Sequence, residues 1–346
     1  MATRIFQGTS RLIMTSKSAS GFLILGIALM LLSACGKAEN LILFVSDRNG
    51  NPEIYTMDPD GNDTTRFTSH LAADSSPNWS PKRDKVAFLQ EETDRTVLKI
   101  AHSDGTNVIT EPSTNGTVWQ YRWSPDGEHI AFTSDMDGQP DIFVLKLDGD
   151  TNEIIAVTKT KEREDLGSWS SDGEWLSYAL FEGESPGVYV RNPNGVDLIR
   201  LTSVPARSPV WSPKGDDIAF YLDGEDGNEI HLVNYSTNEE TGLVTRVDGT
   251  FPVSWSPDGK HIAYVSNQHG NMEIYSMEID GSDQLRLTRN DRLDNNPVWS
   301  PNGKRIAFVS YSGSGDEGGE IFAMDADGSK QRRLTNNPNN DSTPFW

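Results

Sequence analysis

From residue 41 onward, apolar residues occur in short runs that turn-forming residues separate, and the runs follow a repeating order. Each repeat has a segment ending in tryptophan, a turn similar to Ser-Pro-Asp-Gly, and an apolar second segment such as His129–Phe132. A third segment, such as Asp141–Phe143, leads through a glycine turn to a fourth that ends in an apolar residue and threonine. No helical period follows residue 40, so the pattern predicts four short antiparallel strands per repeat.

The tryptophans mark the length of the repeat, because successive ones lie 42 to 47 residues apart. They are Trp79, Trp123, Trp169, Trp211, Trp255, Trp299 and Trp346. A period of this length with several strands per unit predicts a β-propeller with one four-stranded blade per repeat. The ring is large enough to fill the wedge between blades, so we interpret it as a packing residue, with ligand stacking as the alternative.

The two ends of the repeat region complement each other. Leu41–Val45 has the pattern of a second strand without a tryptophan strand before it, and Thr343–Trp346 is a tryptophan strand without a second strand after it. We expect the C-terminal strand to complete the N-terminal blade, which removes exposed sheet edges. This closure predicts an all-β fold of seven blades, with six as the alternative if the weakest unit, Lys82–Thr110, is not a separate blade.

Two strings carry a family resemblance. Val45–Tyr55, V-S-D-R-N-G-N-P-E-I-Y, and Ile321–Gly328, I-F-A-M-D-A-D-G, resemble the repeats of TolB-type β-propeller proteins. The resemblance extends over about residues 41–346 and implies the propeller fold. TolB itself has an additional α/β domain before its propeller, for which residues 36–40 leave no room. The resemblance therefore does not imply the transport role of TolB.

The first 34 residues have the pattern of a targeting signal. The apolar run Gly21–Leu32 is too short to span a bilayer and leads into Leu32-Ser33-Ala34-Cys35. This string resembles a bacterial lipobox, which implies cleavage before Cys35 and lipidation of that residue. An ordinary secretory signal is the alternative, and Met14 is an alternative start.

These features divide the chain into a signal peptide at 1–34, a lipidated cysteine with a short tether at 35–40, and a propeller at 41–346. The expected location is the bacterial cell envelope, outside the cytoplasm. The lipid anchor would lie in the outer or the cytoplasmic membrane. A membrane anchor of this kind needs more than one acyl chain to be stable.

The formal net charge of −21 limits the partners. It argues against nucleic acid, whose backbone requires a basic surface, and against direct binding of anionic lipid headgroups by the protein surface. A solvated surface is the simplest reason for the charge, and a basic protein or peptide partner is the functional one. We expect a monomer.

Residues for catalysis are not evident. The chain has no G-x-S-x-G motif, and its six histidines show no paired metal-ligand spacing. The acidic turns Asp58–Asp63 and Asp325–Gly328 begin like a calcium loop but lack its final glutamate. We therefore expect no catalytic residue, no metal ligand and no cofactor. A hydrolase or lyase in the central channel and a scaffold stabilised by cations are the alternatives.

A register five residues before each tryptophan is acidic in four of seven repeats: Asp74, Glu164, Asp294 and Asp341. We expect this register near the rim of the central channel, where these residues, with Arg207, Trp119 and Tyr121, would contact a partner. Ca²⁺ or another cation is an alternative occupant of the acidic rim, and a turn-capping role is the structural alternative. The sequence thus favours a lipid-anchored propeller that binds an envelope protein or peptide.

Overall fold

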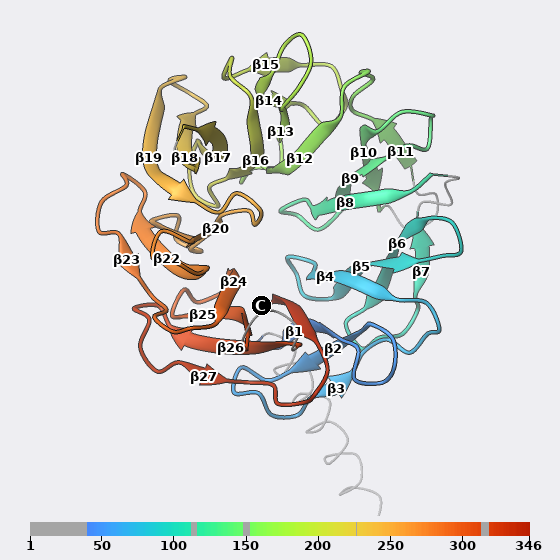
Figure 1. Cartoon of the computed structure of the whole chain (residues 1–346). Helices are drawn as coiled ribbons and strands as arrows, with labels where there is room; N and C mark the ends of the chain where they lie inside the picture. Colours follow the sequence, from blue (N-terminus) through green and yellow to red (C-terminus); the bar gives the residue numbers. More distant parts are fainter. Residues whose placement is uncertain (1–39, 112–115, 148–152, 226, 313–317) are drawn as a thin grey trace, which may run out of the picture. The chain divides into compact units, whose positions relative to one another are not determined.

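The computed structural model describes residues 40–111, 116–147, 153–225, 227–312 and 318–346, which form seven four-stranded antiparallel sheets. The sheets are blades around a central axis, each with one strand innermost (Figure 1). Among these residues there is no helix long and apolar enough to cross a membrane. The structure confirms the predicted all-β propeller with seven blades.

In each blade the four strands follow one another from the axis outward. Blade 1 contains β28 (Asp341–Phe345), β1 (Ile42–Ser46), β2 (Glu53–Met57) and β3 (Thr65–Arg66); blade 2 contains β4 (Asp74–Trp79), β5 (Lys85–Glu91), β6 (Thr96–His102) and β7 (Ile109–Glu111); blade 3 contains β8 (Val118–Trp123), β9 (His129–Ser134), β10 (Asp141–Lys146) and β11 (Glu153–Ala156); blade 4 contains β12 (Glu164–Trp169), β13 (Leu176–Leu180), β14 (Gly187–Arg191) and β15 (Leu198–Arg200). Blade 5 contains β16 (Ala206–Trp211), β17 (Asp217–Gly224), β18 (Gly227–Asn234) and β19 (Glu240–Val247); blade 6 contains β20 (Ser254–Trp255), β21 (His261–Ser266), β22 (Glu273–Glu278) and β23 (Leu285–Arg286); blade 7 contains β24 (Leu293–Trp299), β25 (Arg305–Tyr311), β26 (Gly319–Asp325) and β27 (Arg332–Arg333).

The ring closes through blade 1, as predicted. The C-terminal strand β28 pairs antiparallel with β1, and Leu43 lies opposite Phe345. The guanidinium of Arg48 adds an ion pair to Asp341 at 3.0 Å. The ion pair joins two residues 293 positions apart in the sequence, so the blade depends on both ends of the propeller.

The weakest predicted unit is an independent blade, blade 2. Its first turn has Arg83 where the other turns have glycine, and Arg83 adopts a φ of 54°, close to the 70° of Gly127 in blade 3. The side chain offsets the strain by placing its guanidinium 5.4 Å from the centre of the Trp79 ring. The missing glycine therefore weakens the sequence pattern without removing the turn.

The seven repeat tryptophans are buried, each with 9% or less of its surface exposed. Most indole N–H groups donate to a carbonyl of the preceding blade; Trp169 Nε1 donates to Arg122 O at 3.1 Å and Trp299 Nε1 to Ser254 O at 3.1 Å. The packing interpretation is confirmed, because each ring fills the space between two blades and most of the rings also bond across it.

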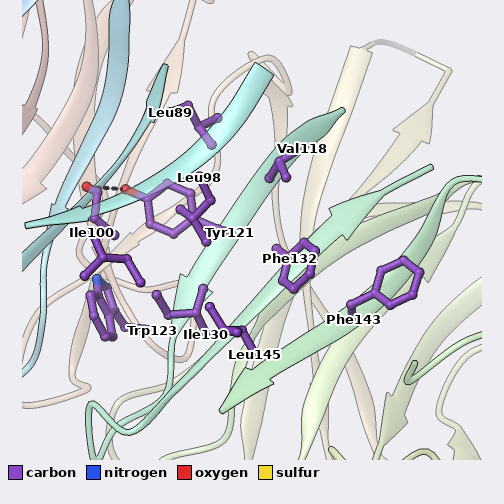
Figure 2. Close-up of a cluster of buried hydrophobic side chains, with 11 residues drawn as sticks. Leu89, Leu98, Ile100, Val118, Tyr121, Trp123, Ile130, Phe132, Phe143 and Leu145 are labelled. Carbon is purple, nitrogen blue, oxygen red and sulfur yellow. Dashed lines mark hydrogen bonds between the residues drawn. The ribbon is translucent and has the colours of Figure 1, made fainter. Parts of the chain in front are cut away.

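Apolar clusters also lie between neighbouring blades rather than within single ones. Figure 2 shows one of them, in which Leu89, Leu98 and Ile100 of blade 2 pack with residues of blade 3. The hydroxyl of Tyr121 on β8 donates across this boundary to Ala87 O at 2.7 Å (Figure 2). No blade buries its apolar surface alone, which is the general condition of repeat folds.

The strand directions give the ring two faces. Inner strands begin on one face, which we call the entry face, together with the hairpins between second and third strands. The Ser-Pro-Asp-Gly-like turns lie on the opposite face, which we call the turn face. Several inner strands have a β-bulge next to a proline, and residues such as Ser208 and Asn296 adopt positive φ there. The bulge accommodates a residue that cannot donate to the ladder.

Candidate functional site

The four acidic residues of the repeat register lie at or near the first position of their inner strands, on the entry face. Their side chains are buried rather than exposed at a rim: Asp74, Asp294 and Asp341 expose 0% and Glu164 exposes 5%. The sequence therefore predicted their depth along the strand but not their orientation. Their carboxylates do not form an open acidic ring in this fold.

Three of these carboxylates accept a hydrogen bond from the side chain four residues earlier. Thr160 Oγ1 donates to Glu164 at 2.6 Å, Asn290 Nδ2 to Asp294 at 2.7 Å, and Asn337 Nδ2 to Asp341 at 2.6 Å. Asp74 accepts instead from Gln90 Nε2 at 2.8 Å. The contacts hold the loop that leads into the inner strand, so the geometry favours a structural role, whereas the predicted partner contacts stay a prediction.

A second acidic residue begins the third strand of the preceding blade and influences the register carboxylates. Burial raises the pKa of Asp294, and the negative charge of Glu273 raises it further. Burial raises the pKa of Glu164 to about 7, and the charge of Asp141 adds to the effect. Because its pKa is about 7, Glu164 is partly protonated at neutral pH. Glu273, in contrast, has an arginine partner, Arg286, at 2.9 Å.

The three other predicted contact residues differ in accessibility. Trp119 exposes 41% of its surface, and Arg207 is partly exposed. Tyr121 is 4% exposed, and besides Ala87 its hydroxyl reaches Ser76 O at 2.5 Å. Tyr121 is thus engaged in packing between blades, and its surface is not open to a partner.

Trp119, Arg207 and Glu164 line one cavity on the entry face, with a volume of about 750 Å³. Its lining residues come from blades 3, 4 and 5. Its other walls include Gln120 of β8 and Phe181, which directly follows β13. We call this space the entry cavity. The structure brings together three of the seven predicted contact residues.

Arg207 is held in place within the entry cavity. Its guanidinium lies 3.8 Å from the centre of the Phe181 ring and donates to Asp223 Oδ2 at 3.0 Å. Phe181 and Gln120 could not be predicted as cavity residues, because neither belongs to a shared position of the repeat. Only the packing of three blades reveals their proximity.

A larger hollow of about 1290 Å³ on the same face, formed by blades 1 to 3, is a weaker candidate. It is mostly polar, and Glu92 within it already pairs with Arg95 at 3.0 Å and Lys99 at 3.6 Å. A ligand that contacted Glu92 would compete with these ion pairs. The entry cavity offers an exposed aromatic ring instead.

In the described part of the chain, no three His, Cys, Asp or Glu side chains are grouped to hold a metal ion. The acidic turns use their carboxylates locally: Asp58 Oδ1 accepts from the backbone N–H groups of Asp60 and Asn62 at 2.8 Å each. A cation at the rim stays a prediction. Cys35 and the predicted signal lie outside the described residues.

Comparisons with known proteins agree with the fold. The family model of the TolB beta propeller domain matches residues 158–346, more than half of the chain. The Tol-Pal system protein TolB of Francisella tularensis subsp. holarctica is 26% identical over 214 residues, covering 60% of this chain and 49% of that protein. The chain thus spans less than half the length of the relatives it matches first.

Solved structures are similar as well, and two of them are described here. TolB from Acinetobacter baumannii aligns with a TM-score of 0.55 at 21% identity, over 78% of this chain and 70% of that one. An oligogalacturonate lyase in complex with manganese aligns with a TM-score of 0.64 at 14% identity, over 79% and 83%. At such identities these likenesses concern the fold alone, and a fold by itself does not assign a function.

Proposed function

Because the chain belongs to the TolB beta propeller domain family, we propose that it is a bacterial envelope protein that binds another protein or a peptide through its entry face. The observation that carries the proposal is the entry cavity, in which Trp119, Phe181 and Arg207 line one space on the entry face. Aromatic and arginine side chains in a partly enclosed pocket are the usual anchors of protein interfaces.

The volume of the entry cavity suits one or two partner side chains rather than a whole domain. Trp119 offers a rigid apolar surface with a hydrogen-bond donor, and the Arg207 guanidinium is already ordered by Phe181 and Asp223. Preordered groups lose little entropy when a partner binds. We therefore assign the entry cavity as the anchor point and the surrounding entry face as the rim of the interface.

Site-specific photo-cross-linking tests this function. We expect a photoreactive phenylalanine at position 119 to trap an envelope protein in cells, because the side chain there faces the partner. The same residue at position 304, an exposed lysine on the turn face, is the control and should trap nothing specific. Arg207→Ala should reduce the yield at position 119 about tenfold. Equal adducts at both positions would refute the assignment of the face.

We also propose that the protein is anchored by lipid on Cys35, on the basis of the Leu32–Cys35 string and the short apolar run before it. Cys35→Ser removes the thiol that would carry the acyl chain. We expect complete loss of fatty-acid labelling and release of the protein from the membrane fraction, since the acyl chains would be the anchor. Labelling that persists in the variant would contradict this anchor.

A further inference from the structure

We propose that the entry cavity receives an arginine side chain of the partner, bound between the ring of Trp119 and the oxygen atoms of Glu164 and Gln120. This inference rests on the proposed function and specifies the chemistry that the partner presents. It follows from three observations: acceptor atoms without donors, an exposed ring, and an equivalent guanidinium site already filled within the same cavity.

Two residues that line the entry cavity each have a buried acceptor atom without a donor. Glu164 accepts from Thr160 through Oε1, but its buried Oε2 has no hydrogen-bond partner. Gln120 donates through Nε2 to Asp165 at 3.4 Å, and its Oε1 also has no partner. Both residues line the cavity. Buried acceptors without donors are costly, so a ligand that brings donors gains more there than at an open surface.

A filled guanidinium site shows what the cavity walls can hold. Arg207 lies against the Phe181 ring at 3.8 Å and pairs with Asp223 at 3.0 Å, so one aromatic face and one carboxylate bind one guanidinium. Trp119 and Glu164 supply the same two elements, an aromatic ring and a carboxyl group, in the lining of the same cavity, and the Trp119 ring is 41% exposed. A second guanidinium therefore has a ring to stack on and acceptors for its N–H groups.

The charge of the lining also favours a cation. Four carboxylates line the cavity, those of Glu162, Glu164, Asp165 and Glu182, against three basic side chains. One of the three, Arg207, is already paired with Asp223, which lies outside the lining. The remaining lining is negative, so a cationic group is drawn in and an anionic one is repelled.

Arginine fits these features better than lysine. A guanidinium is planar and has five N–H donors, so it stacks on an indole while donating to two separate acceptors. An ammonium group is compact and strongly hydrated and does not stack in this way. We therefore propose arginine as the side chain that binds, and the experiment below compares it with lysine.

Binding should depend on pH in a direction that a purely structural role of Glu164 does not produce. Burial raises the pKa of Glu164 to about 7, and the nearby Asp141 carboxylate adds to the effect, whereas the hydrogen bond from the Thr160 hydroxyl opposes it. A guanidinium at Oε2 favours the ionised carboxyl. We therefore expect about tenfold tighter binding at pH 8 than at pH 6, as the free carboxyl loses its proton.

The experiment titrates the full-length protein with a fluorescein-labelled pentapeptide, Gly-Ala-Arg-Ala-Gly, capped at both ends. A twin with citrulline in place of arginine keeps the shape and removes the charge, and a second twin has lysine. We expect the arginine peptide to bind at least tenfold more tightly than either twin at pH 8. Equal binding of the arginine and citrulline peptides, or tighter binding of the lysine peptide, would overturn the inference.

Glu164→Gln is the decisive variant, because it keeps an acceptor oxygen but no charge. We expect it to reduce the affinity for the arginine peptide about tenfold and to abolish the dependence on pH. Asp94→Asn, an exposed carboxylate on the entry face outside the cavity, is the matched control and should change neither. If Glu164→Gln bound the arginine peptide as tightly as the wild type, the proposed arginine site would be wrong.

The arginine site and the proposed function can fail separately. If position 119 still cross-links a partner while the arginine peptide does not bind, the entry face binds by other chemistry and the arginine site is wrong. If the peptide binds and cross-linking finds no partner, the cavity recognises guanidinium groups and the proposed envelope partner is wrong. Melting temperatures of all variants show that each protein is folded before binding is compared.

Discussion

Trp346→Ala is expected to lower the free energy of unfolding by about 3–5 kcal/mol, the usual cost of truncating a large buried aromatic side chain. The ring is 6% exposed and packs with Ile42, Phe44 and Leu334, so it joins blades 7 and 1. The guanidinium of Arg305 lies 5.1 Å from the ring centre. Such a loss is a large share of the total stability of a typical domain.

Deleting Thr343–Trp346 should cost more, because it also removes the pairing of Phe345 with Leu43 and leaves the edge of β1 open. Denaturant titration of both variants, followed by tryptophan fluorescence and circular dichroism, measures the effect. Trp119→Ala is the matched control: the same residue type is lost from another inner strand, but its ring is 41% exposed. A similar loss in Trp346→Ala and Trp119→Ala would mean that closure contributes no special stability.

Glu164→Gln is expected to make the protein more stable at pH 8 by about 1–3 kcal/mol, with little difference near pH 4.5. The sign follows from the pKa of Glu164, which burial raises from an ordinary 4.5 to about 7 in the folded protein. Folding then favours the protonated carboxyl group. The stabilisation of the fold by this protonated group is fully present below the pKa that Glu164 has in the unfolded chain, and it is lost as the pH rises through about 7. Glutamine avoids the loss because it carries no charge.

Urea titrations of both proteins at several pH values from acid to pH 8 check this expectation. Asp258→Asn serves as the opposite control, because a hydrogen bond from the Ser256 hydroxyl lowers the pKa of Asp258 in the turn. That carboxylate stabilises the fold when ionised, so its replacement should reduce stability at neutral pH and matter less in acid. If Glu164→Gln were less stable than the wild type at pH 8, the contact of Glu164 with Thr160 would have to outweigh the cost of the buried charge.

The same substitution is thus expected to raise stability and to weaken binding of the arginine peptide. Opposite effects on stability and on binding are common at functional sites, where a group that destabilises the fold is kept because it binds the ligand. A purely structural carboxylate would show only the first effect. The two measurements on one variant therefore separate a binding role of Glu164 from the loop-holding role that its contact with Thr160 already indicates.

The fold was largely predictable because the same pattern of strands and turns recurs in all seven blades. Trp79 and its six equivalents predicted the blade count, and the unpaired ends at Leu41 and Trp346 predicted the closure. The site was less predictable. A repeat register gives the height of a residue along its strand, but a bulge in the inner strand decides which way the side chain points, so Asp74 and Asp294 are buried.

The entry cavity depends on residues outside the register. Phe181 lies in a hairpin of blade 4, and Arg207 lies in blade 5; no spacing in the sequence relates them, and only the circular arrangement of the blades places the guanidinium against the phenyl ring. Sequence reasoning named Arg207 and Trp119 by residue type and position. The unpaired oxygens of Glu164 and Gln120 appear only once the neighbouring blades are in place.

The closure of blade 1 also sets the order of events during synthesis. The strand β1 pairs with β28, which is synthesised last. The ion pair between Arg48 and Asp341 can therefore form only after another 293 residues have been added to the chain. At roughly 5–20 residues per second, the ribosome takes on the order of tens of seconds to make that stretch. During this time the β1 edge has no partner from its own chain. The nascent protein is therefore most exposed to wrong strand pairing before its last strand emerges, and a chaperone that covers one extended edge would be of most use then.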